Sequence, residues 1–155
     1  MKKIILSFVA LSFSFGVYSQ TIVEAAVSNK DFSTLVTALK AADLVDALSG
    51  EGPFTVFAPN NAAFSKIDSE TLGSLLKPEN VKALTNILTY HVVSGKLMAS
   101  DVASALKSGY GKVKLTALNG QTITARSKGG KIYLKDSQGN MSEIIATDVA
   151  GSNGV

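Results

Sequence analysis

Residues 52–64 read GPFTVFAPNNAAF and combine a strand pattern, a proline and a helix start within thirteen positions. The stretch begins with a run of strand-forming residues, namely Phe54, Thr55, Val56, Phe57 and Ala58. Pro59 has no N–H to give to a sheet, so the strand ends there. Asn60 or Asn61 then offers a side-chain oxygen that can cap the first turn of a helix, in which Phe64 returns an aromatic ring to the core. The stretch therefore predicts one strand–turn–helix unit.

Two later stretches extend this pattern. Tyr90 and His91 close an apolar helical segment and lead into two valines. Near the end, Asp148 precedes Asn153 and Gly154 in the run TDVAGSNGV. Together with residues 52–64, these stretches resemble the two signatures and the tyrosine–histidine segment of the fasciclin (FAS1) domain, an extracellular adhesion and interaction module. The resemblance covers residues 21–155, as a single domain.

The resemblance implies structural and interaction roles for a set of signature residues. They are Thr55, Val56, Phe57, Ala58, Pro59, Asn61, Phe64, Tyr90, His91, Asp148, Asn153 and Gly154. It also implies that Tyr90 and His91 pack against the first signature. Integrin-binding members of the family use an aspartate-containing stretch before the second signature. Only Asp148 matches that stretch here, so integrin binding is poorly supported.

The resemblance also carries an expectation about the end of the domain. Fasciclin domains continue past the Asn-Gly-Val of the second signature with an apolar strand, whereas this sequence stops at Val155. We therefore expect a domain that lacks its last strand, with unpaired backbone groups on neighbouring strands and a smaller core.

The first nineteen residues have the pattern of a cleaved signal peptide. Lys2 and Lys3 are followed by an apolar stretch, residues 4–17, which is short and serine-rich for a membrane span. Cleavage after Ser19 is predicted, with an uncleaved signal anchor as the alternative. The chain has no cysteine, which excludes a lipoprotein anchor and a disulfide framework. The predicted location is secreted or periplasmic, with no stable membrane anchor.

Net charge argues against a nucleic-acid partner. Two of the 15 basic residues, Lys2 and Lys3, leave with the signal peptide, whereas all 12 acidic residues remain. The net charge of the exported chain is then about +1, too small to indicate nucleic-acid binding.

The pattern of apolar residues changes along the chain. Helical spacing predicts helices within residues 31–39, 44–48, 69–76, 78–91 and 100–106, with Asp31 and Ser100 as N-caps. From Lys112 onward the period is two, which predicts strands at 112–117, 122–125, 132–134 and 144–149. Asn119-Gly120 predicts a two-residue hairpin turn. Helices followed by an antiparallel meander indicate an α+β fold. The resemblance implies a wedge of mostly antiparallel strands, with an N-terminal cluster of helices packed against it.

Catalytic and metal-binding patterns are weak. His91 is the only histidine, and a structural role at the helix–strand corner is the preferred interpretation. Asp136, Asn140 and Glu143 surround a turn, but their spacing departs from a calcium loop. No cofactor or metal is predicted, and Asn140 opens a glycosylation sequon.

These observations favour an exported, non-catalytic binding module for cell-surface or matrix adhesion, whose partner is a protein or a polysaccharide. The alternative is a carrier of an apolar small molecule, such as a pigment or lipid, between the helices and the strands. A hydrolytic role would require His91 in a cleft beside a serine or a carboxylate.

Overall fold

The computed structural model describes residues 20–155, so the predicted signal peptide lies outside the described residues. The first half is helical and consists of α1 (Ile22–Ser28), η1 (Lys30–Phe32), α2 (Ser33–Ala41), α3 (Val45–Ser49), α4 (Asn61–Phe64), α5 (Ser69–Leu75), η2 (Pro78–Asn80) and α6 (Val81–Tyr90). Two short strands, β1 (Phe54–Val56) and β2 (Val92–Ser94), flank its second part. The second half contains α7 (Ala99–Ser108), β3 (Lys112–Thr116), β4 (Thr122–Lys128), β5 (Lys131–Lys135) and β6 (Met141–Glu143).

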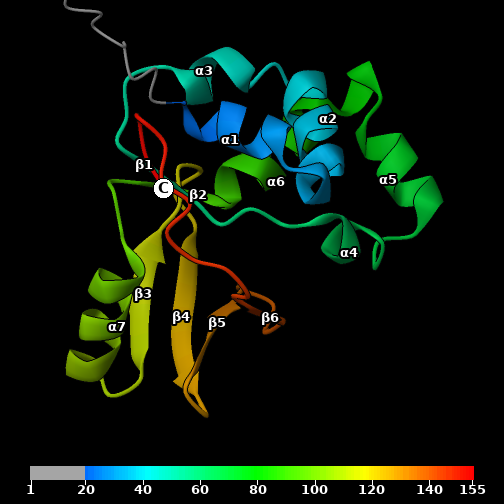
Figure 1. The fold of residues 1–155 in the computed structure, drawn as a ribbon. Helices are drawn as coiled ribbons and strands as arrows, with labels where there is room; N and C mark the ends of the chain where they lie inside the picture. The colour runs from blue at the N-terminus through cyan, green and yellow to red at the C-terminus, as the bar shows by residue number, and fades with distance from the viewer. Residues whose placement is uncertain (1–19) are drawn as a thin grey trace, which may run out of the picture.

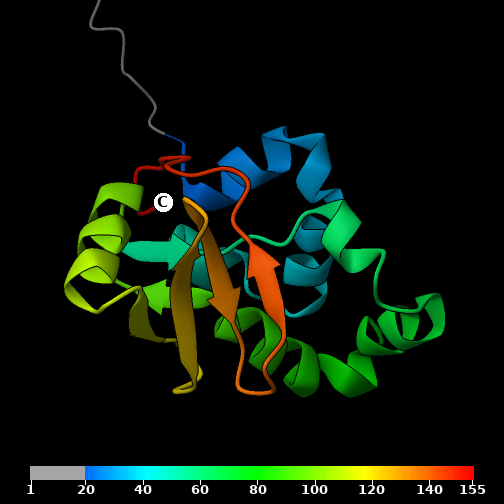
Figure 2. The same cartoon turned by 90° about the horizontal axis from the view of Figure 1, so that it is seen from below.

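The strands form two antiparallel sheets, which confirms the α+β prediction. β1 and β2 make a two-stranded sheet in which Thr55 lies opposite Val93. β3, β4, β5 and β6 follow one another in a four-stranded meander. Val93 also bridges to Ala117, so the small sheet meets the large one just after the end of β3. Figure 1 shows most of the helical half on one side of this junction, with the large sheet and α7 on the other. In Figure 2, α7 and α5 lie at opposite flanks of the molecule.

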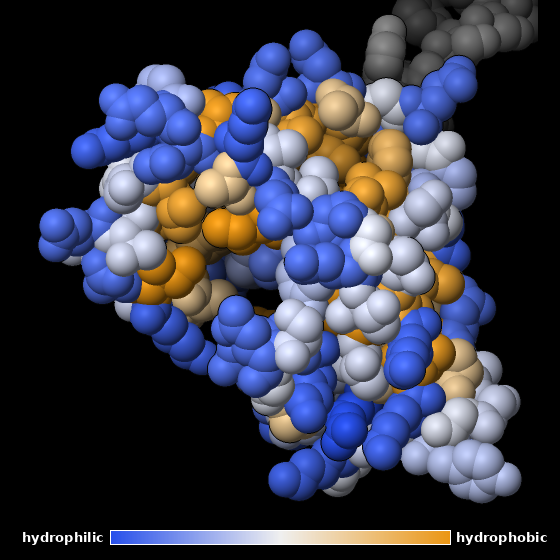
Figure 3. Space-filling model, turned by 180° about the vertical axis from the view of Figure 1, so that it is seen from behind, coloured by the Kyte–Doolittle hydropathy of each residue, from blue (hydrophilic) through white to orange (hydrophobic). Residues whose placement is uncertain are grey.

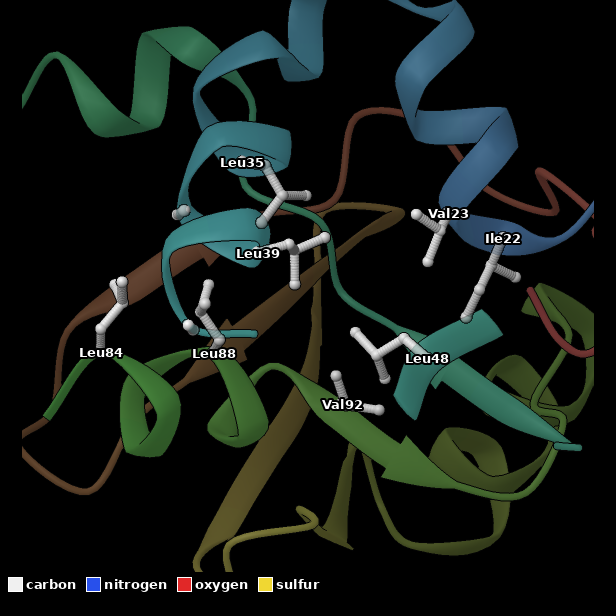
Figure 4. Packing of buried hydrophobic residues seen from close by; sticks show 10 residues of the cluster. Ile22, Val23, Leu35, Leu39, Leu48, Leu84, Leu88 and Val92 are labelled. Atoms are coloured by element: carbon white, nitrogen blue, oxygen red, sulfur yellow. The ribbon is translucent and has the colours of Figure 1, made fainter. Parts of the chain in front are cut away.

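The main core lies in the helical half. Its buried side chains are Ile22, Val23, Leu35, Ala38, Leu39, Ala42, Leu48, Leu84, Leu88 and Val92. Figure 4 shows leucines of α2 and α6 pointing toward one another, four residues apart on each helix. That spacing puts both leucines of a helix on one face, which is why the helical periodicity could be read from the sequence. From behind, hydrophilic side chains interrupted by apolar patches cover this body (Figure 3).

A second, smaller core lies under α7. Val102 and Leu106 of α7 pack against Ala125 of β4, and the apolar residues of β3 and β5 complete the cluster. Along β3 and the first part of β4, more exposed and more buried residues alternate, because only one face of the sheet meets this helix.

Residues 153–155 lie beside β1. The N–H groups of Phe54 and Val56 donate to the carbonyls of Asn153 and Val155, at 3.0 and 2.8 Å, and Gly154 bridges Phe54 in parallel. Residues 153–155 thus supply partners for β1, while the expectation of unpaired groups left by a missing strand after Val155 stays a prediction. The predicted domain limits of 21–155 stay a prediction.

Local predictions near helix starts need two corrections. Asp31 is not the N-cap of a helix over 31–39, because Asn29 caps a 3₁₀ turn by accepting from the Asp31 N–H, and α2 begins only at Ser33. Ser100 is not a cap either, since α7 already begins at Ala99.

Two strand predictions and one turn prediction also differ from the structure. The first strand ends at Val56, two residues before Ala58. The loop after β3 has three residues, Leu118 to Gly120, and not the predicted two, because the Ala117 N–H donates to the Gln121 carbonyl. Of the two predicted turn residues, Gly120 has a positive φ, of 83°, and Asn119 does not. The last strand lies at Met141–Glu143 and not at 144–149. After Ile144 the chain leaves the sheet to reach the start of α7.

Candidate functional site

Thr55 holds the loop that follows β2. Its side chain is buried, and its hydroxyl donates to the Gly95 carbonyl at 2.6 Å while accepting from the Leu97 N–H at 2.8 Å. Both functions of the hydroxyl are thus satisfied inside the protein. The neighbouring residues Phe54, Val56 and Ala58 pack against the main core. The strand part of the first signature is therefore engaged in packing.

The two asparagines after Pro59 have separate tasks. Asn60 is the N-cap of α4, since its side-chain oxygen accepts from the Ala63 N–H at 2.9 Å. Asn61 reaches across to the start of α2, where its oxygen accepts from the Thr34 N–H at 3.0 Å. Its amide group donates to the Lys30 carbonyl and to the Ser33 hydroxyl, at 3.0 and 2.9 Å. Asn61 thereby joins α4 to α2, while Phe64 packs against the core.

Tyr90 and His91 form the corner between α6 and β2. The His91 carbonyl accepts from the Phe57 N–H at 2.8 Å, so this corner lies directly beside the first signature. The His91 Nδ1 is 2.8 Å from the Ile87 carbonyl. Because a carbonyl oxygen can only accept, Nδ1 carries the proton in this contact. The Tyr90 ring stands edge-on to the imidazole, with centroids 5.8 Å apart. The arrangement holds a corner of the backbone.

Asn153 connects the end of the described chain to its beginning. Its side-chain oxygen accepts from the Ile22 N–H in the first turn of α1, at 3.0 Å. Its amide group donates to the Leu48 and Gly50 carbonyls at the end of α3, at 2.7 and 2.9 Å. Gly154 comes next and lies against the backbone of Phe54. Asn153 and Gly154 thus hold the end of the described chain against α1, the end of α3 and β1.

Asp148 caps α7 from outside that helix. Its Oδ1 accepts from the Ala99 N–H at 2.7 Å, and its own backbone has a positive φ of 58°. A carboxylate at this position also opposes the partial positive charge of the helix N-terminus. Within α7, Asp101 accepts from the Met98 N–H at 2.9 Å. The residue that the family resemblance ties to adhesion therefore already has an intramolecular partner.

Replacing Asp148 by alanine is expected to lower the free energy of unfolding by about 1–2 kcal/mol, because the Ala99 N–H loses its acceptor and alanine disfavours positive φ. Asp148→Asn keeps an acceptor and tolerates this φ, so we expect a loss smaller by at least half. Urea unfolding of the three proteins measures the difference. Equal stability of the alanine variant and the parent chain would contradict the capping role.

A shallow hollow lies beside Tyr90. It has a volume of about 250 Å³ and is lined by Asn86, Ile87, Tyr90, Gln121, Asp136, Ser137 and Gln138. Burial, and next the negative charge of Asp136, raise the pKa of the Tyr90 phenol. The Tyr90 hydroxyl makes a long, 3.4 Å contact to the Thr122 carbonyl. The lining of the hollow combines polar side chains with the apolar surfaces of Ile87 and Tyr90.

The turn predicted around Asp136 does not gather metal ligands. The Asp136 oxygens accept from the Gln138 and Asn140 N–H groups and from the Asn140 side chain. The hydrogen bond from the Asn140 side chain is the main cause that lowers the pKa of Asp136. Glu143 pairs instead with Lys131, at 2.7 Å. Within residues 20–155, no group of three or more histidine or acidic side chains is placed to hold a metal ion.

A fasciclin domain model matches residues 30–155. This chain belongs to the fasciclin domain family. The fasciclin chain is 49% identical over 137 residues to Protein sll1483 of Synechocystis sp., which covers 88% of this chain and 69% of the relative. It is 40% identical over 92 residues to the cell surface glycolipoprotein MPB83 of Mycobacterium bovis, covering 56% of this chain and 40% of that protein.

A solved structure shares the fold. The FAS1 domain pair from the insect cell adhesion molecule Fasciclin I superimposes with a TM-score of 0.76, at 18% identity, over 90% of this chain and 49% of that one. The fasciclin fold predicted from residues 52–64 is therefore confirmed. Among the residues described, none of the helices has the length and apolar character required to cross a bilayer.

Proposed function

We propose that this fasciclin protein is an exported, non-catalytic binding module that acts in adhesion at the cell surface or in the matrix. The proposal includes a signal peptide at residues 1–19 and a single domain from residue 21 to residue 155. Its partner is a surface or matrix protein or polysaccharide. Support comes from the family, in which one similar protein is named for the cell surface and one structural neighbour for cell adhesion.

The observation that carries the proposal is the use made of the signature side chains. Thr55, Asn61 and Asn153 each direct their polar atoms to backbone groups of the same domain. Asp148 does the same at the start of α7. The signatures thereby build a rigid frame, and recognition falls to the exposed strands and loops that this frame carries.

The two rival functions have less support. The hollow beside Tyr90 offers an apolar cargo only a mixed lining. A more apolar hollow between α7 and the β4–β5 turn, lined in part by Leu106 and Ile132, has a volume of about 320 Å³, close to the lower limit for ligand pockets. A hydrolytic role would need His91 to activate a nucleophile. The one hydrogen bond of the His91 ring among residues 20–155 goes from Nδ1 to the Ile87 carbonyl, and no serine hydroxyl or carboxylate bonds to that ring there.

A cell-binding assay tests the proposal. Fluorescently labelled protein, expressed as the full chain and collected after export, is added to cells of the producing species. We expect saturable binding to intact cells that falls after the surface is stripped with proteases or polysaccharide-degrading enzymes. Absence of binding to untreated cells, together with an apolar molecule in a solvent extract of the purified protein, would support the carrier and overturn the adhesion proposal.

A further inference from the structure

The four-stranded sheet has two faces of opposite character. Its inner face, which includes Val113 and Ala125, packs under α7. Because side chains alternate along a strand, the intervening residues point to the other side. The register confirms a common outer face, since Lys112 lies opposite Arg126 and Arg126 opposite Tyr133. We define the cationic face as the basic side chains of this outer surface: Lys112, Lys114, Arg126, Lys128, Lys131 and Lys135.

The cationic face places like charges directly opposite each other. Lys112 faces Arg126 across β3 and β4, and Lys128 faces Lys131 across β4 and β5. Like charges in such positions destabilise a sheet. Lysines on the edge strand β3 can be explained as protection against edge pairing, but β4 and β5 are interior strands. Folding alone therefore gives no reason for this arrangement.

Acidic side chains do little to neutralise the cationic face. Between Val102 and Lys135 every charged residue is a lysine or an arginine. Lys131 pairs with Glu143 at 2.7 Å, and the hydrogen bond to Glu143 raises the pKa of Lys131. Within residues 20–155, the other five cations of this face make no ion pair. Figure 3 shows hydrophilic side chains gathered in the lower part of the molecule, at the height of this sheet.

We propose that the cationic face binds an anionic polysaccharide, a polymer that carries carboxylate or sulfate groups. This inference rests on the proposed binding function and names the partner of that function. Neighbouring strands lie about 4.8 Å apart, and the Cα atoms of residues two apart on one strand lie about 6.7 Å apart. Several cations thus lie within one Debye length, roughly 10 Å at 0.1 M salt. A chain of closely spaced anions can contact several of them together.

The other side chains of this face favour a polysaccharide over other polyanions. Thr116, Thr122 and Thr124 share it, and their hydroxyls can hydrogen-bond to sugar hydroxyls. Single-stranded nucleic acid needs several aromatic side chains for stacking, whereas β3, β4 and β5 offer only Tyr133 here. Stable membrane binding usually combines basic residues with several apolar side chains that enter the interface, and Tyr133 is the one large ring that these three strands present on this face.

Binding to matched polymers tests the inference. The full chain is passed over immobilised dextran sulfate, alginate and uncharged dextran at two salt concentrations. We expect binding to either or both of the charged polymers, none to dextran, and weaker binding as salt rises. The variant K112Q/K114Q/K128Q should raise the Kd for the charged polymer about tenfold. The control K40Q/K66Q/K77Q removes the same charge from exposed lysines of the helical half and should change the Kd less than threefold.

Thermal unfolding checks that both triple variants stay folded. An equal loss of binding in the two variants, or equal binding to dextran and dextran sulfate, would overturn the inference. Tighter binding to single-stranded DNA or to anionic phospholipid vesicles than to both polysaccharides would overturn it as well. If the face variant still adheres to cells like the parent chain, the adhesion proposal stands and this partner is wrong. If the parent chain does not adhere to cells, the adhesion proposal itself fails.

Discussion

Gly154→Ala is expected to lower the free energy of unfolding by about 4 kcal/mol or more. A Cβ at position 154 would lie 2.1 Å from the Phe54 carbonyl oxygen and 2.9 Å from its carbon. Both atoms belong to the backbone of β1 and cannot rotate away. The strand and residues 153–155 would have to separate, which breaks the bonds from Phe54 to Asn153 and Val155.

Gly73→Ala is the matched control for this prediction. Gly73 lies inside α5, and a Cβ there meets nothing within 4 Å. Alanine should therefore stabilise the domain by about 0.5–1 kcal/mol, because it favours the helix. Urea unfolding followed by circular dichroism measures both variants. A Gly154→Ala protein that unfolds at the same urea concentration as the parent would show that residues 153–155 do not pack on β1.

Asn153→Asp is expected to cost about 3 kcal/mol, although the two side chains have the same shape. The aspartate can still accept from the Ile22 N–H, but it can no longer donate to the Leu48 and Gly50 carbonyls. Two hydrogen bonds are lost, and a negative charge is placed beside two carbonyl oxygens. The loss should diminish in acid, where a protonated carboxyl can donate once.

The control for this change is Asn119→Asp in the exposed β3–β4 turn. Asn119 also donates to a backbone carbonyl, that of Asn86, but water reaches this site. We expect a cost below about 1 kcal/mol there. Unfolding free energies measured at neutral pH and again at pH 4 separate the two positions. Similar losses of unfolding free energy for both variants at neutral pH would mean that Asn153 does not hold α1 and the end of α3 together.

The first signature could be predicted because its physics is local. Pro59 ends a strand and Asn60 caps the helix that follows, and both effects act within a few residues. The roles of Asn153 and Asp148 could not be predicted in this way. The partners of Asn153 lie 103–131 residues away, and Ala99 is 49 residues from Asp148. Nothing near these residues in the sequence indicates which helix end they reach.

The cationic face shows the same limit in a sheet. The alternation of Lys112 and Lys114 with apolar residues is visible in the sequence, and it predicts a half-buried strand. The strand register decides which cations of β4 and β5 lie on the same face of the sheet as Lys112 and Lys114. The register in turn follows from the geometry of the turns. The loop after β3 has three residues and not the two that Asn119-Gly120 suggested. The net charge of the chain also gives no sign of the cationic face, because acidic residues elsewhere in the chain balance its positive charges.

The hydrogen bonds of Asn153 have a consequence for how this domain folds during its synthesis. Ile22 and Asn153 meet through a hydrogen bond, and Gln20 accepts one from the Ser152 N–H at 2.7 Å. Synthesis and translocation proceed from the amino end, so Ile22 meets Asn153 only after 131 further residues have emerged. Until then α1 lacks its closing neighbour, and the nascent chain stays open to chaperones and proteases. The packing around α1 is thereby completed late in the synthesis of this domain.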